Sequence, residues 1–188
     1  ACRDALGPDV PVLDTLFDPF QQVMRRIGFS GAGLLCEHPR EALPMLEALC
    51  ETTLDYVRRL KALGIDGVLY ATNGAICHPG DRGVPEDAYR TLIRPFDRRI
   101  LEALDGMVRI VHAHGAPIDL ARMLDYPCEA WSVSDRLPGN PSLADLRRLT
   151  GRCLMGGIHE GRLHDRSVPE LDAEIADAIG QAGSRGFI

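Results

Sequence analysis

One repeated unit constrains this chain more than any other feature: a helical stretch, a glycine, a short strand that is apolar on both sides, and a polar loop. The unit occurs four times from residue 44 onward. Strands that alternate with helices in this way pair in parallel through right-handed crossovers. A doubly wound open sheet and a (β/α)8 barrel both satisfy the pattern. No GxGxxG or Walker sequence opens any of the helices, which argues against a nucleotide-binding open sheet.

Six segments have strand character, whereas a complete barrel has eight strands and takes about 250 residues. They cover residues 10–17, 66–71, 108–112, 128–133, 152–156 and 186–188. The sequence therefore predicts an α/β fold of the (β/α)8, TIM-barrel type that is incomplete, with about six of the eight strands. We expect residues 1–188 to form a single barrel domain that is truncated at both ends.

Two long helices are predicted over residues 39–63 and 85–104, where apolar residues recur at intervals of three and four. Pro44 either marks the start of the first helix or kinks its first turn, and Pro95 should bend the second.

Shorter helices are predicted over 20–27 and 118–124, and the glycine-rich segment 28–36 is expected to be a loop. Two further helices should begin at capping boxes, formed by Ser142 with Asp145 and by Ser167 with Glu170.

Composition excludes several classes of protein. The chain has 45% apolar residues and a net charge of −6, and its arginines are scattered as singles and pairs, so nothing favours nucleic acid. It contains no apolar run near 18 residues and no signal sequence, so no membrane segment is expected. The six cysteines show no CxxC spacing, which favours reduced thiols in a cytoplasmic protein.

Polar side chains follow four of the predicted strands, where a barrel places its catalytic groups. They are Thr72, Asn73, Cys77 and His78; His112 and His114; Ser134 and Asp135; and His159 and Glu160. We therefore expect these residues to meet at one mouth of the barrel, with Asn73, His78 and His159 as candidates for binding substrate.

His112 and His114 are the strongest candidates, because a period of two turns both imidazoles to one side of their strand. They could be metal ligands or a pair that binds anions and transfers protons. Alternatively, one is a hydrogen-bonded interior histidine and the other a loop residue. A zinc site would need a third ligand, from Cys77, His78, His159, Glu160 or a residue beyond Ile188.

The other candidates have competing structural explanations. Asp135 could hold a substrate amine or ring NH, or it could cap the turn before Pro138. His159 and Glu160 follow two glycines that would let a ligand approach the backbone, although a surface loop pair is the commoner outcome.

The order of segments resembles the uroporphyrinogen decarboxylase superfamily, which includes the tetrapyrrole decarboxylase and zinc-dependent methyltransferases acting between corrinoid proteins and thiols. The matching stretches are LKALGIDGVLYATNGA (60–75), IRPFDRRILEAL (93–104), RIVHAHG (109–115), CEAWSVSD (128–135) and RCLMGGIH with the following helix and GSRGFI (152–188).

The resemblance implies a cleft at the carboxyl ends of the barrel strands. It also implies that the arginine-bearing segment and the aspartate of the decarboxylase would precede Ala1, and that a final histidine or cysteine segment would follow Ile188. The zinc methyltransferases show His-x-Cys-Gly where this chain has His112-Ala113-His114-Gly115, so His112 matches a ligand and His114 replaces a cysteine.

Three functions follow from these expectations. The first is decarboxylation of a uroporphyrinogen-like tetrapyrrole without a cofactor, as in porphyrin biosynthesis. The close alternative is a zinc-dependent methyl transfer from a corrinoid protein or another methyl donor to a thiol. The third is a non-catalytic relative that binds a tetrapyrrole or corrinoid, or an inactive fragment. Neither the substrate nor a homodimeric state follows from the residues.

Overall fold

The sheet is parallel and its strands follow one another in sequence order. The computed structural model describes residues 5–28, 31–76 and 83–188. A single five-stranded sheet has the order β1-β2-β3-β4-β5. Its strands are β1 (Leu13–Phe17), β2 (Gly67–Thr72), β3 (Val108–Ala113), β4 (Ala130–Val133) and β5 (Cys153–Met155). A doubly wound sheet reverses its strand order at a switch point, whereas here every new strand is added on the same side. The predicted barrel-type architecture is therefore confirmed.

The sixth predicted strand is reduced to a single bridge. Phe187 pairs in parallel with Leu154 of β5. The backbone N–H of Leu154 donates to Gly186 O at 2.9 Å, and Ile188 N–H donates back to Leu154 O at 2.8 Å. The end of the chain thus continues the sheet in the same direction and order.

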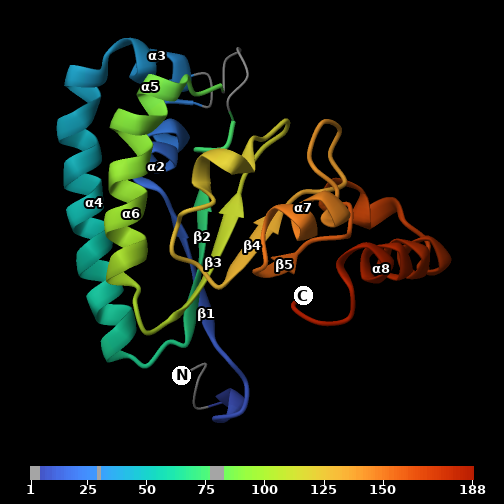
Figure 1. The fold of residues 1–188 in the computed structure, drawn as a ribbon. Helices are drawn as coiled ribbons and strands as arrows, with labels where there is room; N and C mark the ends of the chain where they lie inside the picture. The colour runs from blue at the N-terminus through green and yellow to red at the C-terminus, as the bar shows by residue number, and fades with distance from the viewer. Residues whose placement is uncertain (1–4, 29–30, 77–82) are drawn as a thin grey trace.

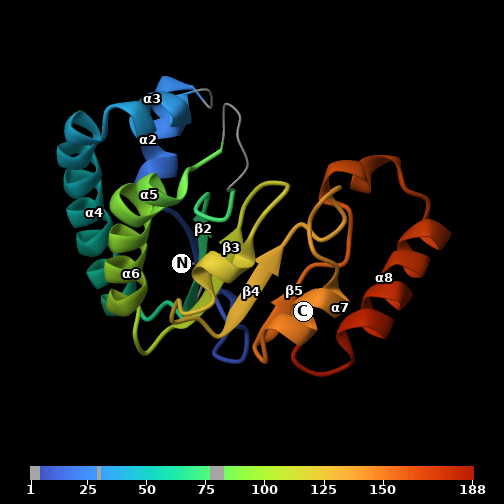
Figure 2. The ribbon, with the colours of Figure 1, turned by 45° about the horizontal axis from the view of Figure 1, so that its top comes forward.

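Helices lie between the strands and cover one face of the sheet. In Figure 1, α4 and α6 run side by side along this face, and α7 and α8 lie at its β5 end; Figure 2 shows the same arrangement from another side. The α-helices are α2 (Pro19–Ile27), α3 (Gly31–Glu37), α4 (Pro39–Ala62), α5 (Glu86–Ala88), α6 (Arg94–Ala103), α7 (Leu143–Leu149) and α8 (Val168–Ala182). Two 3-10 helices, η2 (Leu120–Met123) and η3 (Glu160–Asp165), follow β3 and β5. Within the described residues, no helix is long and apolar enough to cross a membrane.

The expectation of a loop over residues 28–36 is wrong for the part that the structure describes. Residues from Gly31 onward form α3, in which Ala32 and Leu35 are buried. Glycine weakens a helix by about 1 kcal/mol relative to alanine. Burial of the apolar side chains in the core outweighs this weak local preference.

Both internal prolines are accommodated. α4 begins at Pro39 and continues through Pro44, so this proline does not mark the start of the helix. Before Pro95 the chain forms a π-helical segment of five residues, η1 (Tyr89–Ile93), which leads into α6. Proline lacks the N–H that an α-helix would bond to the carbonyl four residues earlier, and the wider turn of η1 lies where that bond would be missing.

Helix starts follow the predicted caps. Ser142 Oγ accepts from Asp145 N–H at 3.1 Å, and Asp145 returns a bond from Ser142 N–H at 3.2 Å. At α8, Ser167 N–H donates to Glu170 at 2.8 Å. Both capping boxes are present, because each depends only on residues three apart in the sequence.

A buried carboxylate ties α6 to the sheet. Asp97 accepts hydrogen bonds from Tyr70 Oη at 2.7 Å, Thr72 Oγ1 at 2.9 Å and Tyr126 Oη at 2.9 Å. Burial is the main cause that raises the pKa of Asp97 well above its ordinary value, and the charge of Asp18 adds to it.

Asp18 fixes the first strand to the second at their carboxyl ends. Its carboxylate accepts from Gln21 N–H at 2.7 Å, which caps α2, and from Asn73 N–H at 3.0 Å, just after β2. Burial raises the pKa of Asp18 to about 6, although these backbone donors oppose the shift.

We expect Asp18 to make the protein less stable as the pH rises. Its pKa is higher in the folded protein than the unfolded value of about 3.9, so folding takes up a proton between these values. Its contribution to stability is greatest below about pH 4 and is lost as the pH rises through about 6. Asp18→Asn keeps a side chain that can cap α2. The free energy of unfolding, measured with urea at about pH 4 and about pH 6, should therefore fall less with pH in this variant than in the unmodified protein.

Asp55→Asn is the matched control. Hydrogen bonds from Arg59 and Arg58 lower the pKa of the exposed Asp55, so its removal should change the pH dependence in the opposite direction. Parallel stability curves for Asp18→Asn and the unmodified protein would contradict the prediction.

Candidate functional site

The site is built on the face of the sheet that the helices leave uncovered. The register places Ala71 beside His112, His112 beside Ser132, and Ser132 beside Met155. Neighbouring residues in parallel strands project to the same face, so these side chains form one row across the sheet. The opposite face carries Tyr70, Val111 and Trp131, which are fully buried.

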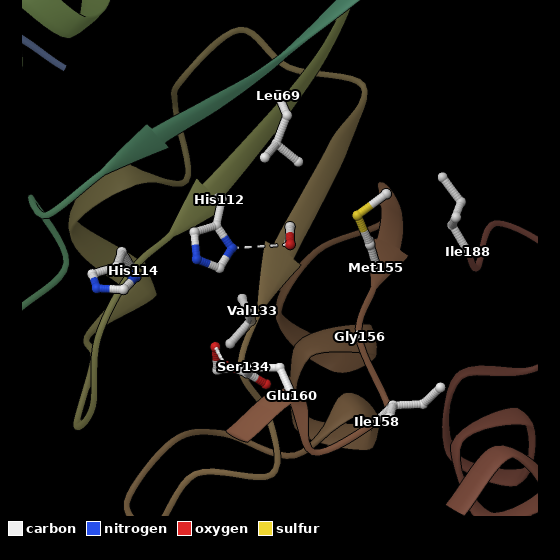
Figure 3. Close-up of a pocket in the computed structure, with 11 residues that line it drawn as sticks. Leu69, His112, His114, Val133, Ser134, Met155, Gly156, Ile158, Glu160 and Ile188 are labelled. Atoms are coloured by element: carbon white, nitrogen blue, oxygen red, sulfur yellow. Dashed lines mark hydrogen bonds between the residues drawn. The ribbon is translucent and has the colours of Figure 1, made fainter. Parts of the chain in front are cut away.

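A pocket of about 560 Å³ opens over this row. Figure 3 shows the side chains that line it, with His112 and His114 on one side and Met155 and Ile188 on the other. The pocket is lined by Leu69, His112, His114, Ser132, Val133, Ser134, Met155, Gly156, Ile158, Glu160 and Ile188. Its wall is therefore apolar apart from two histidines, two serines and one glutamate.

His112 is held by its neighbour in the next strand. Its Nδ1 lies 3.0 Å from Ser132 Oγ, and Figure 3 shows the other ring nitrogen on the side of His114. Burial lowers the pKa of His112, the nearby His114 lowers it further, and Glu160 opposes the shift. His112 is consequently a neutral, oriented imidazole near pH 7, the form that can accept a proton or bind a metal.

His114 follows the last residue of β3 and is exposed. Its backbone N–H donates to the backbone carbonyl of Thr72 at 3.0 Å. The two imidazole centroids are 5.6 Å apart and their planes are tilted by 51°. The predicted pairing of His112 and His114 at the strand end is present in the structure.

Glu160 enters the pocket from η3. It accepts a short hydrogen bond from Ser134 Oγ, which lies just after β4. The sequence offered only a weak signal for this residue, because η3 (Glu160–Asp165) has no buried apolar residue to reveal how it is placed. Ser132 was not among the sequence candidates. Its place beside His112 follows from the register between β3 and β4, which the pattern of a single strand does not give.

Asp135 does not line the pocket. Its carboxylate accepts from Gly157 N–H at 2.6 Å and lies 3.4 Å from Arg136 Nε. Burial raises the pKa of this carboxyl. In the structure, Asp135 joins the loop after β4 to the loop after β5.

Of the three residues expected to bind substrate, the two that the structure describes do not line the pocket. Asn73 is buried, and its Nδ2 donates to Met24 Sδ at 3.5 Å. The backbone N–H of His159 donates to Glu174 at 3.3 Å, and this histidine is not part of the pocket wall. His78 lies outside the described residues, as does Cys77, a possible third ligand.

Gly156 and Gly157 are closely packed. A Cβ at Gly156 would lie 2.7 Å from Asp135 Oδ1, and one at Gly157 would lie 2.4 Å from Ala178 Cβ of α8. Gly157 also has φ of +96°, which side chains rarely adopt. The space beside these two glycines, which the sequence suggested for a ligand, is therefore filled by the carboxylate of Asp135 and by α8.

Comparisons with known proteins place this geometry in a family. The family model described as uroporphyrinogen decarboxylase (URO-D) matches residues 1–188. No curated protein matches the chain. Among solved structures, a "methyltransferase from Methanosarcina mazei" is similar with a TM-score of 0.78 and 18% identity, over 95% of this chain and 52% of that one.

A second solved structure is described as the putative vitamin-B12 independent methionine synthase from Listeria monocytogenes. It has a TM-score of 0.57 and 12% identity, over 98% of this chain and 57% of the other. Both likenesses support the barrel-type fold. The chain spans about half the length of each of these proteins.

We expect Gly157→Ala to destabilise the protein by about 2–4 kcal/mol, because the new methyl group adds a clash with Ala178 to a strained backbone. Gly180→Ala in α8 is the control: a Cβ there meets nothing within 4 Å, and alanine should stabilise the helix by up to about 1 kcal/mol. Urea unfolding of both variants measures the difference, and equal stabilities would show that α8 does not pack on Gly157.

Proposed function

Because the chain belongs to the uroporphyrinogen decarboxylase family, we propose that it is a methyl-transferring member of this superfamily that binds zinc through His112 and His114 and acts on a thiol. The paired imidazoles carry the proposal. A corrinoid protein or a small methyl compound is the expected donor.

The spacing of the two histidines suits a shared zinc ion. With Zn–N bonds of about 2.0–2.1 Å and a tetrahedral angle, two imidazole centroids lie about 5 Å apart. The observed separation is 5.6 Å. Ser132 Oγ engages Nδ1 of His112, which leaves Nε2 as the ligand atom and fixes the ring, as partners outside the ligand set commonly do in metal sites.

A zinc ion would need at least one protein ligand besides the two histidines. Among residues 5–28, 31–76 and 83–188, no group of three His, Cys, Asp or Glu side chains is arranged to hold a metal. When bound, zinc would lower the pKa of a coordinated thiol and so supply a thiolate nucleophile. Glu160, which lines the same pocket and accepts a hydrogen bond from Ser134, would take up the proton of an entering thiol.

The described pocket wall carries no cationic side chain, and the family resemblance expects the arginine-bearing segment of the decarboxylase before Ala1. A uroporphyrinogen carries several carboxylates, which cationic side chains would be expected to bind. None of the described residues that line the pocket is a lysine or an arginine, and one is a glutamate. Arg136, on the loop after β4, is turned toward α8, where Nη1 lies 2.6 Å from Asp177 and Nε donates to Gly157 O.

We expect zinc binding to depend on His112. Removing one of two protein ligands should weaken zinc binding by at least about 100-fold, and Ser132→Ala, which only frees the His112 ring, by about tenfold. Titration of the metal-free protein with zinc in competition with a chelator dye would measure both changes for His112→Ala and Ser132→Ala.

His164→Ala is the matched control, since this exposed histidine on η3 lies 3.1 Å from Asp165 and outside the pocket. Zinc binding that is unchanged in His112→Ala, or lowered equally in His164→Ala, would refute the proposed metal site. Release of carbon dioxide from uroporphyrinogen, with no methylation of a thiol, would instead favour the decarboxylase.

A further inference from the structure

A second cleft, separate from the histidine pocket, is lined by arginines. It has a volume of about 510 Å³ and lies where α5, η1 and the start of α6 meet η2. Its lining residues are Glu86, Tyr89, Arg90, Arg94, Ala121 and Arg122, none of which lines the histidine pocket. Three guanidinium groups and one carboxylate leave this wall with an excess of positive charge in a protein whose net charge is −6.

Arg122 is fixed at the inner wall of this cleft. Its side chain is only 6% exposed, and its Cζ lies 4.4 Å from the centroid of the Tyr89 ring. Nη1 donates to Val84 O at 3.1 Å, whereas Nη2 is buried and has no hydrogen-bond partner among the described residues. A buried guanidinium N–H without an acceptor is unfavourable, so this atom marks a place where an acceptor would be stabilising.

Glu86 shows what kind of group fits between the arginines. One of its carboxylate oxygens accepts from Arg90 Nε at 2.6 Å, and the other accepts from Arg122 Nε at 3.0 Å. The two guanidinium groups are therefore spaced to hold two oxygens of one anion. A carboxylate has no third oxygen to offer to Nη2 of Arg122, whereas a tetrahedral phosphoryl group does.

Arg94 completes the positive wall. Both of its terminal nitrogens bond to Asp125, at 2.9 and 2.5 Å, and its side chain is 31% exposed. This pair holds the guanidinium plane in place and neutralises part of its charge. Arg90 is more open, with a side chain that is 68% exposed, and can turn toward a ligand.

We propose that this cleft binds the phosphoryl group of a small ligand. Arg122 and Arg90 supply the hydrogen-bond donors, Arg94 adds positive charge, and the ring of Tyr89 packs against the guanidinium group of Arg122. The carboxylate of Glu86 occupies part of the same site and competes with the ligand. The affinity of the cleft for phosphate therefore depends on how readily phosphate displaces this carboxylate from Arg90 and Arg122.

Calorimetric titration of the protein with inorganic phosphate at low ionic strength and neutral pH tests the site. We expect Arg122→Met to weaken phosphate binding by about tenfold or more, since it removes a charged donor. Arg90→Gln should weaken it by about threefold to tenfold. Glu86→Gln should tighten it, because the competing negative charge is removed while an oxygen remains for the arginines.

Arg99→Gln is the matched control, since Arg99 lies on α6 but pairs with Glu47 and Glu51 of α4. It should bind phosphate like the unmodified protein. Arg90→Gln and Glu86→Gln change exposed side chains, so they test the site even if Arg122→Met does not fold. Acetate that competes less well than phosphate supports a phosphoryl ligand, and equal competition would overturn that choice.

The proposal as a whole is overturned if the unmodified protein does not bind phosphate. It is also overturned if Arg90→Gln and Glu86→Gln bind phosphate as tightly as the unmodified protein, or if Arg99→Gln weakens binding as much as Arg90→Gln.

Discussion

The register of β3 between β2 and β4 is the constraint on which the candidate site depends. Ladder hydrogen bonds place His112 beside Ser132, and a slip of one residue would turn every side chain of β3 to the other face. The imidazole would then face the helices and Val111 would face the pocket. The burial of Val111 and Ala113 on the helix side opposes such a slip, so apolar packing on one face orients the chemistry on the other.

The polar groups behind the sheet add a second set of restraints. Asp97 reaches from α6 to Tyr70 and Thr72 of β2, and to Tyr126 in the segment before β4. Tyr126 Oη lies 3.1 Å from Tyr89 Oη, and Tyr89 donates to Arg122 O. Hydrogen bonds therefore run from the end of β2 to the residue at the inner wall of the arginine-lined cleft. The fold positions both clefts through the same helix layer.

Local signals in the sequence were enough to predict most of the architecture. The glycines before β2, β3 and β5, the helical spacing of apolar residues and both capping boxes depend on residues close in the chain. The structure confirms the five strands, the two long helical segments and both capped helices, whereas residues 120–123 form a 3-10 helix and Phe187 a single bridge. The helix at Gly31–Glu37 was missed because its stability comes from packing against the core rather than from its own residues.

The candidate site was predictable only in part. A strand period of two identified the histidine pair, but no local pattern could show that Glu160 folds back to Ser134 or that Asp135 is taken up by the backbone of Gly157. The arginine-lined cleft joins Glu86 and Arg122, which are 36 residues apart, and their separate surroundings in the sequence look like ordinary helix surfaces.

Helices on one face only give each strand two different evolutionary constraints. Side chains that point to the helix layer, such as Tyr70 and Trp131, fill a close-packed interior and tolerate little change in volume. Side chains that point to the open face, such as His112 and Met155, are only partly buried and line the pocket. Successive residues of one strand can therefore diverge at different rates, which would let a lineage acquire new chemistry while its scaffold stays the same.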